Sequence, residues 1–169
     1  ALPVFFGPAT AISWVSVDME GIEELITAYA HDIDDGALEG WPNYFTEDGS
    51  YLIITRESFE AGLPMGIMYC QGRGMMADRV KAMLTANIYE AHTYCHIIGR
   101  SQISALGEGQ FQVRTNFNVI RTMQDGRTEG FAVGKYLDLI EARDDKPLFK
   151  ERKVVLESRR VDILLVYPL

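Results

Sequence analysis

Apolar and polar residues alternate along the last third of the chain, and this pattern predicts an antiparallel meander of three strands from Gln110 to Val166. A period of two is expected of a strand with one buried face. The first strand shows it clearly, since polar residues separate Phe111, Val113, Phe117 and Val119. The meander is therefore the element around which we expect the chain to fold.

Two turn signals divide this meander. Asp125-Gly126 accepts the positive φ that a tight hairpin requires, and Asp144-Asp145-Lys146-Pro147 marks the second turn. The other two strands are predicted at Gly130–Leu137 and Leu148–Val166. Because sheets twist, strands of this length must curl, and a curled sheet needs other elements to cover its concave side.

Helical spacing of apolar residues precedes the meander. We expect a first helix that Asp18 caps and Gly36 ends, with one apolar face made by Ile22, Leu25, Ile26, Tyr29 and Ile33. A second, shorter helix is predicted from Leu38 to Phe45. A third is predicted from Arg73 to Leu84, with a common face formed by Met76, Val80, Met83 and Leu84.

The segments between these helices read as strands. We expect strands at Ser50–Thr55 and Tyr94–Leu106, a second strand or extended segment at Met65–Gln71, and a loop or single helical turn at Glu57–Leu63. An order of helices first and mostly strands afterwards predicts an α+β fold. Its curved antiparallel sheet would form a half-barrel or cone that the N-terminal helices cover.

Length and composition predict one globular domain. We assign residues 18–169 to a single cone-shaped α+β domain and residues 1–17 to an N-terminal arm. The formal net charge of −8 argues against a nucleic-acid partner, because no counterion release would favour binding. No apolar run predicts a membrane span, and the arm lacks the basic region of a signal peptide. Cys70 and Cys95 are too few for a disulfide framework, which favours reduced thiols in a cytoplasmic protein.

The three histidines of the chain are His31, His92 and His96. The last two are four residues apart, a spacing that would direct both toward one metal ion on a helix. Their surroundings favour a strand, on which four residues span about 13 Å, too far for two ligands of one ion. Two cysteines also cannot supply a Rieske cluster, and no phosphate loop or nucleophile elbow is present. We therefore expect no metal ligands and no cofactor-binding residues in this chain.

Acid–base chemistry is the remaining possibility for the chain alone. The first predicted helix ends with Tyr29, His31, Asp32, Asp34 and Asp35, and Tyr94 and His96 lie on the strand beyond the third helix. If a cone closes around them, a histidine and a carboxylate can meet in an apolar cavity. The alternative is that the acidic cluster faces solvent and that His96 is a core or interface histidine.

Several runs of sequence resemble the small (beta) subunits of aromatic-ring-hydroxylating, Rieske non-haem iron dioxygenases. The resemblance covers about residues 18–169. It depends on five motifs that occur in the same order as in the family, and not on any single motif. The motifs are Trp41–Tyr51, Met76–Val80 with the following His96–Gly99, Val119–Arg121, Gly134–Asp138 and Arg160–Leu164. The sequence is most similar to those of family members that act on benzoate-type acids such as terephthalate, salicylate or anthranilate.

This resemblance implies the cone fold of scytalone dehydratase and nuclear transport factor 2. It also implies a structural, non-catalytic role in aromatic catabolism, within a complex that inserts O2 into a benzoate-like ring. The partner would be a catalytic alpha subunit with a Rieske [2Fe-2S] cluster and mononuclear Fe(II), supplied with electrons from NAD(P)H through a reductase. Other beta subunits would form a trimer within an α3β3 assembly.

One departure and one rival interpretation remain. The family often has Arg-His where this chain has Cys95-His96, and Ser-Asn where it has Gly99-Arg100, so no polar contact is carried over there. The rival is a stand-alone dehydratase or isomerase of the same cone, with Tyr29, Asp32 and His96 as its acid–base set. In the favoured interpretation no catalytic residue is expected, and the contact surfaces are the N-terminal arm and the meander, especially Phe149–Leu169.

Overall fold

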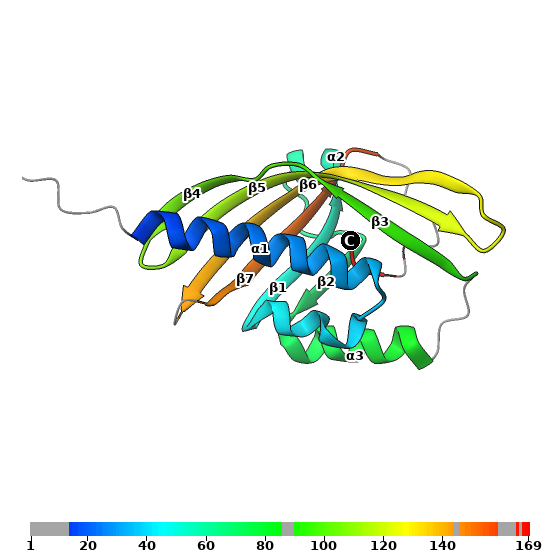
Figure 1. Ribbon diagram of the computed structural model, residues 1–169, viewed down its shortest axis with the longest axis horizontal. Coiled ribbons are helices and arrows are strands. Elements are labelled where there is room, and N and C mark those ends of the chain that lie inside the picture. Colours follow the sequence, from blue (N-terminus) through cyan, green and yellow to red (C-terminus); the bar gives the residue numbers. More distant parts are fainter. Residues whose placement is uncertain (1–13, 86–89, 144–145, 159–164, 166) are drawn as a thin grey trace, which may run out of the picture.

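A strongly curved sheet dominates the molecule, and the longest helix lies lengthwise across its hollow side (Figure 1). The computed structural model describes residues 14–85, 90–143, 146–158, 165 and 167–169. Helices cover one face of a mainly antiparallel sheet that does not close on itself, so the predicted α+β class is confirmed.

The predicted meander forms the centre of this sheet. Its strands are β5 (Gln110–Met123), β6 (Thr128–Arg143) and β7 (Lys146–Leu156), and each pairs antiparallel with the next. Gly126 takes a φ of +85° in the β5–β6 turn, as predicted. Residues 144 and 145 of the second predicted turn lie outside the described residues.

The third strand was predicted to reach Val166, and this is wrong, because β7 ends at Leu156. Glu157 and Ser158 are not part of a strand, and Pro168 and Leu169 are buried in the core on the hollow side of the sheet. Residues 159–164 and 166 lie outside the described part of the chain.

The other strands extend the sheet on both sides. β1 (Phe45–Thr55) runs parallel to β7. β2 (Met68–Gln71) pairs with the other side of β1 and forms the edge of the sheet. At the opposite edge, β3 (His92–Ile98) and β4 (Gln102–Gly107) pair with successive parts of β5. The strand order is therefore β2-β1-β7-β6-β5-β3, with β4 also on β5.

A single strand was predicted over Tyr94–Leu106, whereas the structure has two. Ile98 pairs with Phe117 and Gln102 pairs with Arg114, so four steps along one chain oppose three along β5. The extra residue cannot join the ladder, and the strand is interrupted as it is at a bulge. The Ser101 hydroxyl bonds the Thr115 hydroxyl within this interruption, at 2.8 Å.

Helix α1 (Trp14–Asp34) begins four residues before its predicted cap, Asp18. No glycine or proline separates Trp14 from Asp18, so nothing in the sequence ends the helix between them. The end of the helix is as predicted, since Gly36 has a φ of +75° and donates its N–H to the Ile33 carbonyl at 3.1 Å. The division into an arm and a domain stays a prediction, because residues 1–13 lie outside the described ones.

Three shorter helices surround β1 and β2. They are η1 (Leu38–Tyr44), a 3-10 helix, α2 (Arg56–Glu60) and α3 (Gly72–Thr85). Most of the predicted apolar face of α3 is buried. The prediction that Leu84 shares this face is wrong, because Leu84 is 51% exposed. It lies at the margin of the stripe that Met76, Val80 and Met83 form, one residue before the end of the helix.

The core lies between α1 and the inner face of the sheet. The apolar stripe of α1 is buried as predicted, and so are the inward residues of β5. No helix in the described part of the chain is both long enough and apolar enough to cross a membrane.

Candidate functional site

A buried ion pair occupies the inner face of the sheet. Asp138 on β6 and Arg152 on β7 are register partners, and both side chains are completely buried. The guanidinium donates two parallel hydrogen bonds to the carboxylate, from Nε to Oδ1 at 3.0 Å and from Nη2 to Oδ2 at 2.9 Å. Such two-point geometry is the strongest form of this contact.

Aromatic rings surround the guanidinium on its other sides. Its central carbon lies 4.2 Å from the ring centre of Tyr29 and 4.0 Å from those of Tyr136 and Phe149. Burial by itself would lower the pKa of Arg152, but the Asp138 carboxylate more than offsets this and holds the pKa above its usual value. The centre of the cone is therefore a permanent cation that the chain's own groups enclose.

Leu169 fills the space beside this pair. The residue is fully buried, and its carbonyl accepts hydrogen bonds from the hydroxyls of Tyr29 at 3.0 Å and Tyr51 at 3.2 Å. Trp41 donates its Nε1–H to the Tyr29 oxygen at 3.1 Å. Burial raises the pKa of both tyrosines, so both hydroxyls stay protonated at neutral pH and act as donors.

The three residues of the predicted acid–base set have separate partners. Tyr29 bonds Leu169, whereas Asp32 accepts a hydrogen bond of 2.5 Å from the hydroxyl of Tyr44. Burial, and then Asp32 itself, raises the pKa of Tyr44. His96 bonds neither of the other two, and the role of the set stays a prediction.

His96 is held by Asp34 instead. Its Nδ1 lies 2.5 Å from one carboxylate oxygen of Asp34, and its backbone N–H donates to the other at 2.7 Å. The imidazole is completely buried. The pair borders a groove of about 370 Å³ between α1 and the β3–β4 edge, which His31 and Arg100 also line. The contact fastens the end of α1 to the edge of the sheet.

The other polar residues near this edge belong to β3. His92 and His96 lie on one strand, as predicted from their surroundings. The Nδ1 of His92 lies 2.8 Å from the carbonyl oxygen of Glu90. Tyr94 is buried and stacks on Phe131, with ring centres 5.0 Å apart.

The two cysteines do not fit an iron–sulfur cluster. Cys70 lies on β2 and Cys95 on β3, at opposite edges of the sheet with four strands between them. Five strand spacings correspond to about 24 Å along the sheet, whereas cluster ligands must contact the same ion. Within the described residues, no three His, Cys, Asp or Glu side chains are grouped so that they could hold a metal ion.

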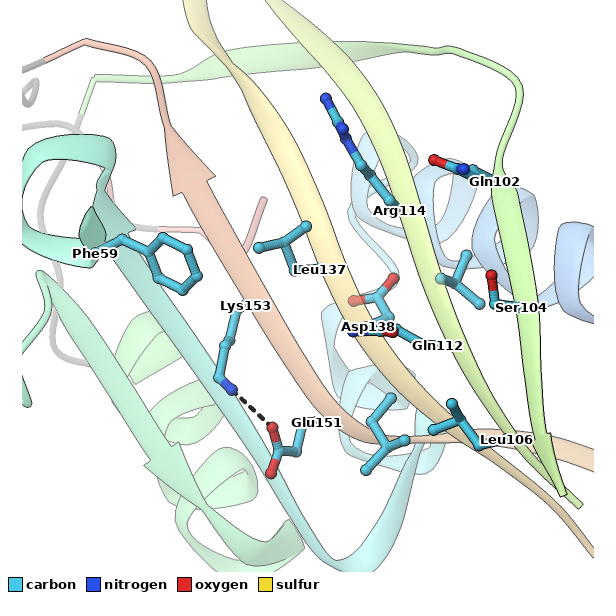
Figure 2. A pocket seen from close by; sticks show the side chains of 12 residues that line it. Phe59, Gln102, Ser104, Leu106, Gln112, Arg114, Leu137, Asp138, Glu151 and Lys153 are labelled. Atoms are coloured by element: carbon cyan, nitrogen blue, oxygen red, sulfur yellow. Dashed lines mark hydrogen bonds and ion pairs between the residues drawn. The ribbon is translucent and has the colours of Figure 1, made fainter. Parts of the chain in front are cut away.

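A second groove, of about 540 Å³, lies on the outer face of the sheet (Figure 2). Figure 2 shows Arg114, Leu137 and an ion pair between Lys153 and Glu151, with Phe59 of α2 at one side. The two charged groups are 2.9 Å apart. Asp138 also borders this groove, but its carboxylate bonds Arg152 on the inner face.

Sequence reasoning missed the central ion pair, although the strand period contains a signal for it. Arg152 stands two positions before Val154 and four before Leu156, which are both buried, and Asp138 stands two positions after buried Tyr136. A charged residue in phase with the apolar face of a strand points inward. Two such residues on adjacent strands predict a buried pair.

Comparisons with known proteins identify the relatives. The family described as "Ring hydroxylating beta subunit" matches residues 29–162, which is more than half of the chain. The chain is 40% identical over 142 residues to a terephthalate 1,2-dioxygenase terminal oxygenase component subunit beta 2 from Comamonas sp., covering 84% of this chain and 92% of that one. It is 36% identical over 141 residues to an anthranilate 1,2-dioxygenase small subunit from Burkholderia cepacia, covering 83% and 88%.

Solved structures agree with this. A beta subunit assigned to an aromatic-ring-hydroxylating dioxygenase of Novosphingobium aromaticivorans matches with a TM-score of 0.83 and 35% identity, covering 90% of this chain and 97% of that one. More distant matches show the fold alone. A protein assigned as a scytalone dehydratase has a TM-score of 0.67 at 20% identity, and an NTF2-like protein has 0.63 at 19%.

These matches confirm the predicted resemblance and fold, and they favour the subunit interpretation over a stand-alone dehydratase or isomerase. The relatives are matched over most of their own length, so the likeness extends to whole subunits rather than to a fragment. The chain belongs to the family of ring-hydroxylating beta subunits.

Proposed function

We propose that this chain is the structural, non-catalytic beta subunit of a multicomponent aromatic-ring-hydroxylating dioxygenase. The observation that carries the proposal is the closed inner face of the cone. Arg152 and Asp138 bond each other, and Leu169 occupies the space beside them. A cone that is filled in this way serves as a rigid body on which other subunits assemble.

The partner is a catalytic alpha subunit, and the complex is a hetero-oligomer in the cytoplasm. Two relatives carry the descriptions "small subunit" and "terminal oxygenase component subunit beta", which supports a larger companion chain. That companion would carry the Rieske [2Fe-2S] cluster and the mononuclear Fe(II), and a reductase would supply electrons from NAD(P)H. Three alpha and three beta subunits in an α3β3 assembly are the arrangement we propose.

The substrate class is an aromatic carboxylic acid. The relatives named above act on anthranilate and terephthalate, and both compounds carry a carboxylate on a benzene ring. The reaction of the complex would insert O2 into such a ring. This chain would contribute the position of its partner rather than a group that touches the ring.

The surface that we assign to the partner is the apolar strip, defined as Phe59, Leu63, Met65, Ile67 and Tyr69. These residues follow one another at the β2 edge and are 39–80% exposed. The strip adjoins a groove with three glutamates and one arginine, namely Glu57, Glu60, Glu157 and Arg56. A partner surface with apolar side chains and a basic rim matches this combination of apolarity and charge.

The strip replaces part of the predicted contact surface. Phe149 and Leu169 were predicted to contact the partner, but both are fully buried in this chain's own core. Whether the N-terminal arm makes a contact stays a prediction, because its residues 1–13 are outside the described ones.

The test is co-expression with the proposed alpha subunit. We expect a stoichiometric complex that contains iron and oxidises the ring, whereas this chain alone should bind no iron and oxidise nothing. Met65→Asp should lower the affinity for the alpha subunit by at least about tenfold. Leu84→Asp is the matched control, because Leu84 is an exposed apolar residue outside the strip. Turnover by this chain alone would refute the proposal.

A further inference from the structure

Leu169 makes an unusual set of contacts for a residue inside a cone. Its backbone N–H donates to the Tyr51 hydroxyl oxygen at 2.9 Å, and its carbonyl accepts from the same hydroxyl at 3.2 Å. The Tyr29 hydroxyl donates a further hydrogen bond to that carbonyl at 3.0 Å. Both polar groups of the Leu169 backbone are therefore bound by side chains rather than by a strand or helix.

The two tyrosines that make these contacts, and the Trp41 that supports them, come from three different elements. Tyr29 belongs to α1, Trp41 to η1 and Tyr51 to β1, and each is at most 1% exposed. Trp41 and Tyr51 pack edge to face with ring centres 5.1 Å apart, and Trp41 donates to the Tyr29 oxygen. Each ring is fixed by its neighbours, so the donors are already oriented for a carbonyl oxygen.

The surroundings define the chemistry of an occupant. Phe149 packs edge to face on Tyr29 with ring centres 5.6 Å apart, and Phe45 packs in the same way on Trp41 at 5.7 Å. The charge of Arg152 is already neutralised by Asp138. Such a site offers two hydroxyl donors and one acceptor within an apolar enclosure, which suits a neutral amide with an apolar side chain.

We propose that Tyr29, Trp41 and Tyr51 form a binding site for a neutral N-acylated apolar amino acid, and that the chain fills this site with its own Leu169. The residue acts as an internal ligand that latches the end of the described chain to α1 and β1. Removing the latch exposes a site that takes a small molecule of the same chemistry.

The experiment uses the chain shortened after Tyr167, with Trp14→Phe so that Trp41 is the only tryptophan. The probe is N-acetyl-L-leucinamide, which reproduces the N–H, carbonyl and side chain of Leu169. We expect a saturable change in Trp41 fluorescence, and a rise in melting temperature of about 4 °C when the probe is at about ten times its Kd.

Three controls separate this site from general apolar binding. N-acetylglycinamide lacks the side chain and should give no saturable change. Tyr51→Phe in the shortened chain removes the hydroxyl that exchanges two hydrogen bonds, and should weaken probe binding at least about tenfold. The chain that retains Leu169 should not respond at the same probe concentration, because its site is filled.

Two outcomes overturn the proposal. The first is a shortened chain that folds, as its circular dichroism shows, but binds the probe no better than the chain with Leu169 or the Tyr51→Phe variant does. If the shortened chain unfolds on its own, the probe should restore its near-ultraviolet circular dichroism while N-acetylglycinamide does not. The second outcome that overturns the proposal is that the probe fails to restore this signal.

Discussion

The inner face around Arg152 and the apolar strip at the β2 edge break the usual rule of burial in opposite ways. Arg152 and Asp138 are charged and completely buried, whereas the apolar side chain of Met65 is 80% exposed. Globular proteins rarely bury an unpaired charge and rarely expose a run of large apolar side chains. The buried charges are paired within the chain, whereas we propose that a second molecule covers the exposed apolar side chains.

The difference lies in what each region has for neighbours. The guanidinium of Arg152 has a carboxylate and three aromatic rings within contact distance. In the strip, the Ile67 N–H bonds the Ile53 carbonyl at 2.7 Å, which fixes the backbone while the side chain stays 41% exposed. Substitutions at the inner face should therefore change folding, and substitutions in the strip should change association.

The largest effect is expected from Arg152→Met. This change leaves the Asp138 carboxylate buried without its partner, and we expect a loss of about 3–5 kcal/mol in the free energy of unfolding. Urea denaturation followed by circular dichroism measures it. The double variant Asp138→Leu with Arg152→Met is the control, and it should recover most of the loss because no charge is left buried. Equal stability of the single variant and the parent would contradict an ion pair at the centre of the fold.

A smaller effect is expected at alkaline pH from three buried tyrosines. Burial raises the pKa of Tyr29, Tyr51 and Tyr136 above the usual value of 10.0. Their contribution to stability is complete below the pKa of the unfolded chain and is lost as pH rises toward the folded pKa. At about pH 10.5 the three together should lower the free energy of unfolding by about 2–3 kcal/mol.

Absorbance at the tyrosinate band measures this directly. The three buried tyrosines should ionise only when the protein unfolds. Replacing Tyr136 by Phe, which removes one of the three groups, should reduce the alkaline loss by about a third. A single titration of all tyrosines near pH 10 in the folded protein would be inconsistent with their burial.

More of the inner face than of the apolar strip could be predicted from the sequence. The alternation in β5 and the helical stripe of α1 predicted which residues are buried, because burial on one face of a regular element leaves a period in the sequence. Arg152 shares that period with Val154, so it was open to prediction, although the pair with Asp138 required the register of two strands.

Other features had no such signal. Leu169 is buried in the cone although β7 ends at Leu156, and no local sequence pattern specifies where a residue beyond the last strand will pack. The pairing of His96 with Asp34 joins residues 62 positions apart. The strip reads as an apolar loop, and only the fold shows that no element of the described chain covers it.

The pair of Asp34 and His96 gives an intermediate test, because it belongs to neither region. Asp34→Ala removes the acceptor of the His96 imidazole and of its backbone N–H, and should cost about 2 kcal/mol of unfolding free energy. Asp35→Ala is the matched control, since Asp35 is an exposed acid one position further on. Hydrogen exchange at the His96 amide provides a local measurement, and it should become faster in the first variant only.

The smallest effect on folding is expected from Met65→Asp. The side chain is mostly solvent-exposed, so the free energy of unfolding of the isolated chain should change by no more than about 0.5 kcal/mol. The isolated chain leaves the strip uncovered, and we expect it to self-associate at high concentration and the variant to do so less. Sedimentation velocity at several concentrations measures this, with Leu84→Asp as the control outside the strip. A large loss of stability in Met65→Asp would mean that the strip packs against this chain itself, and the contrast with the inner face would then fail.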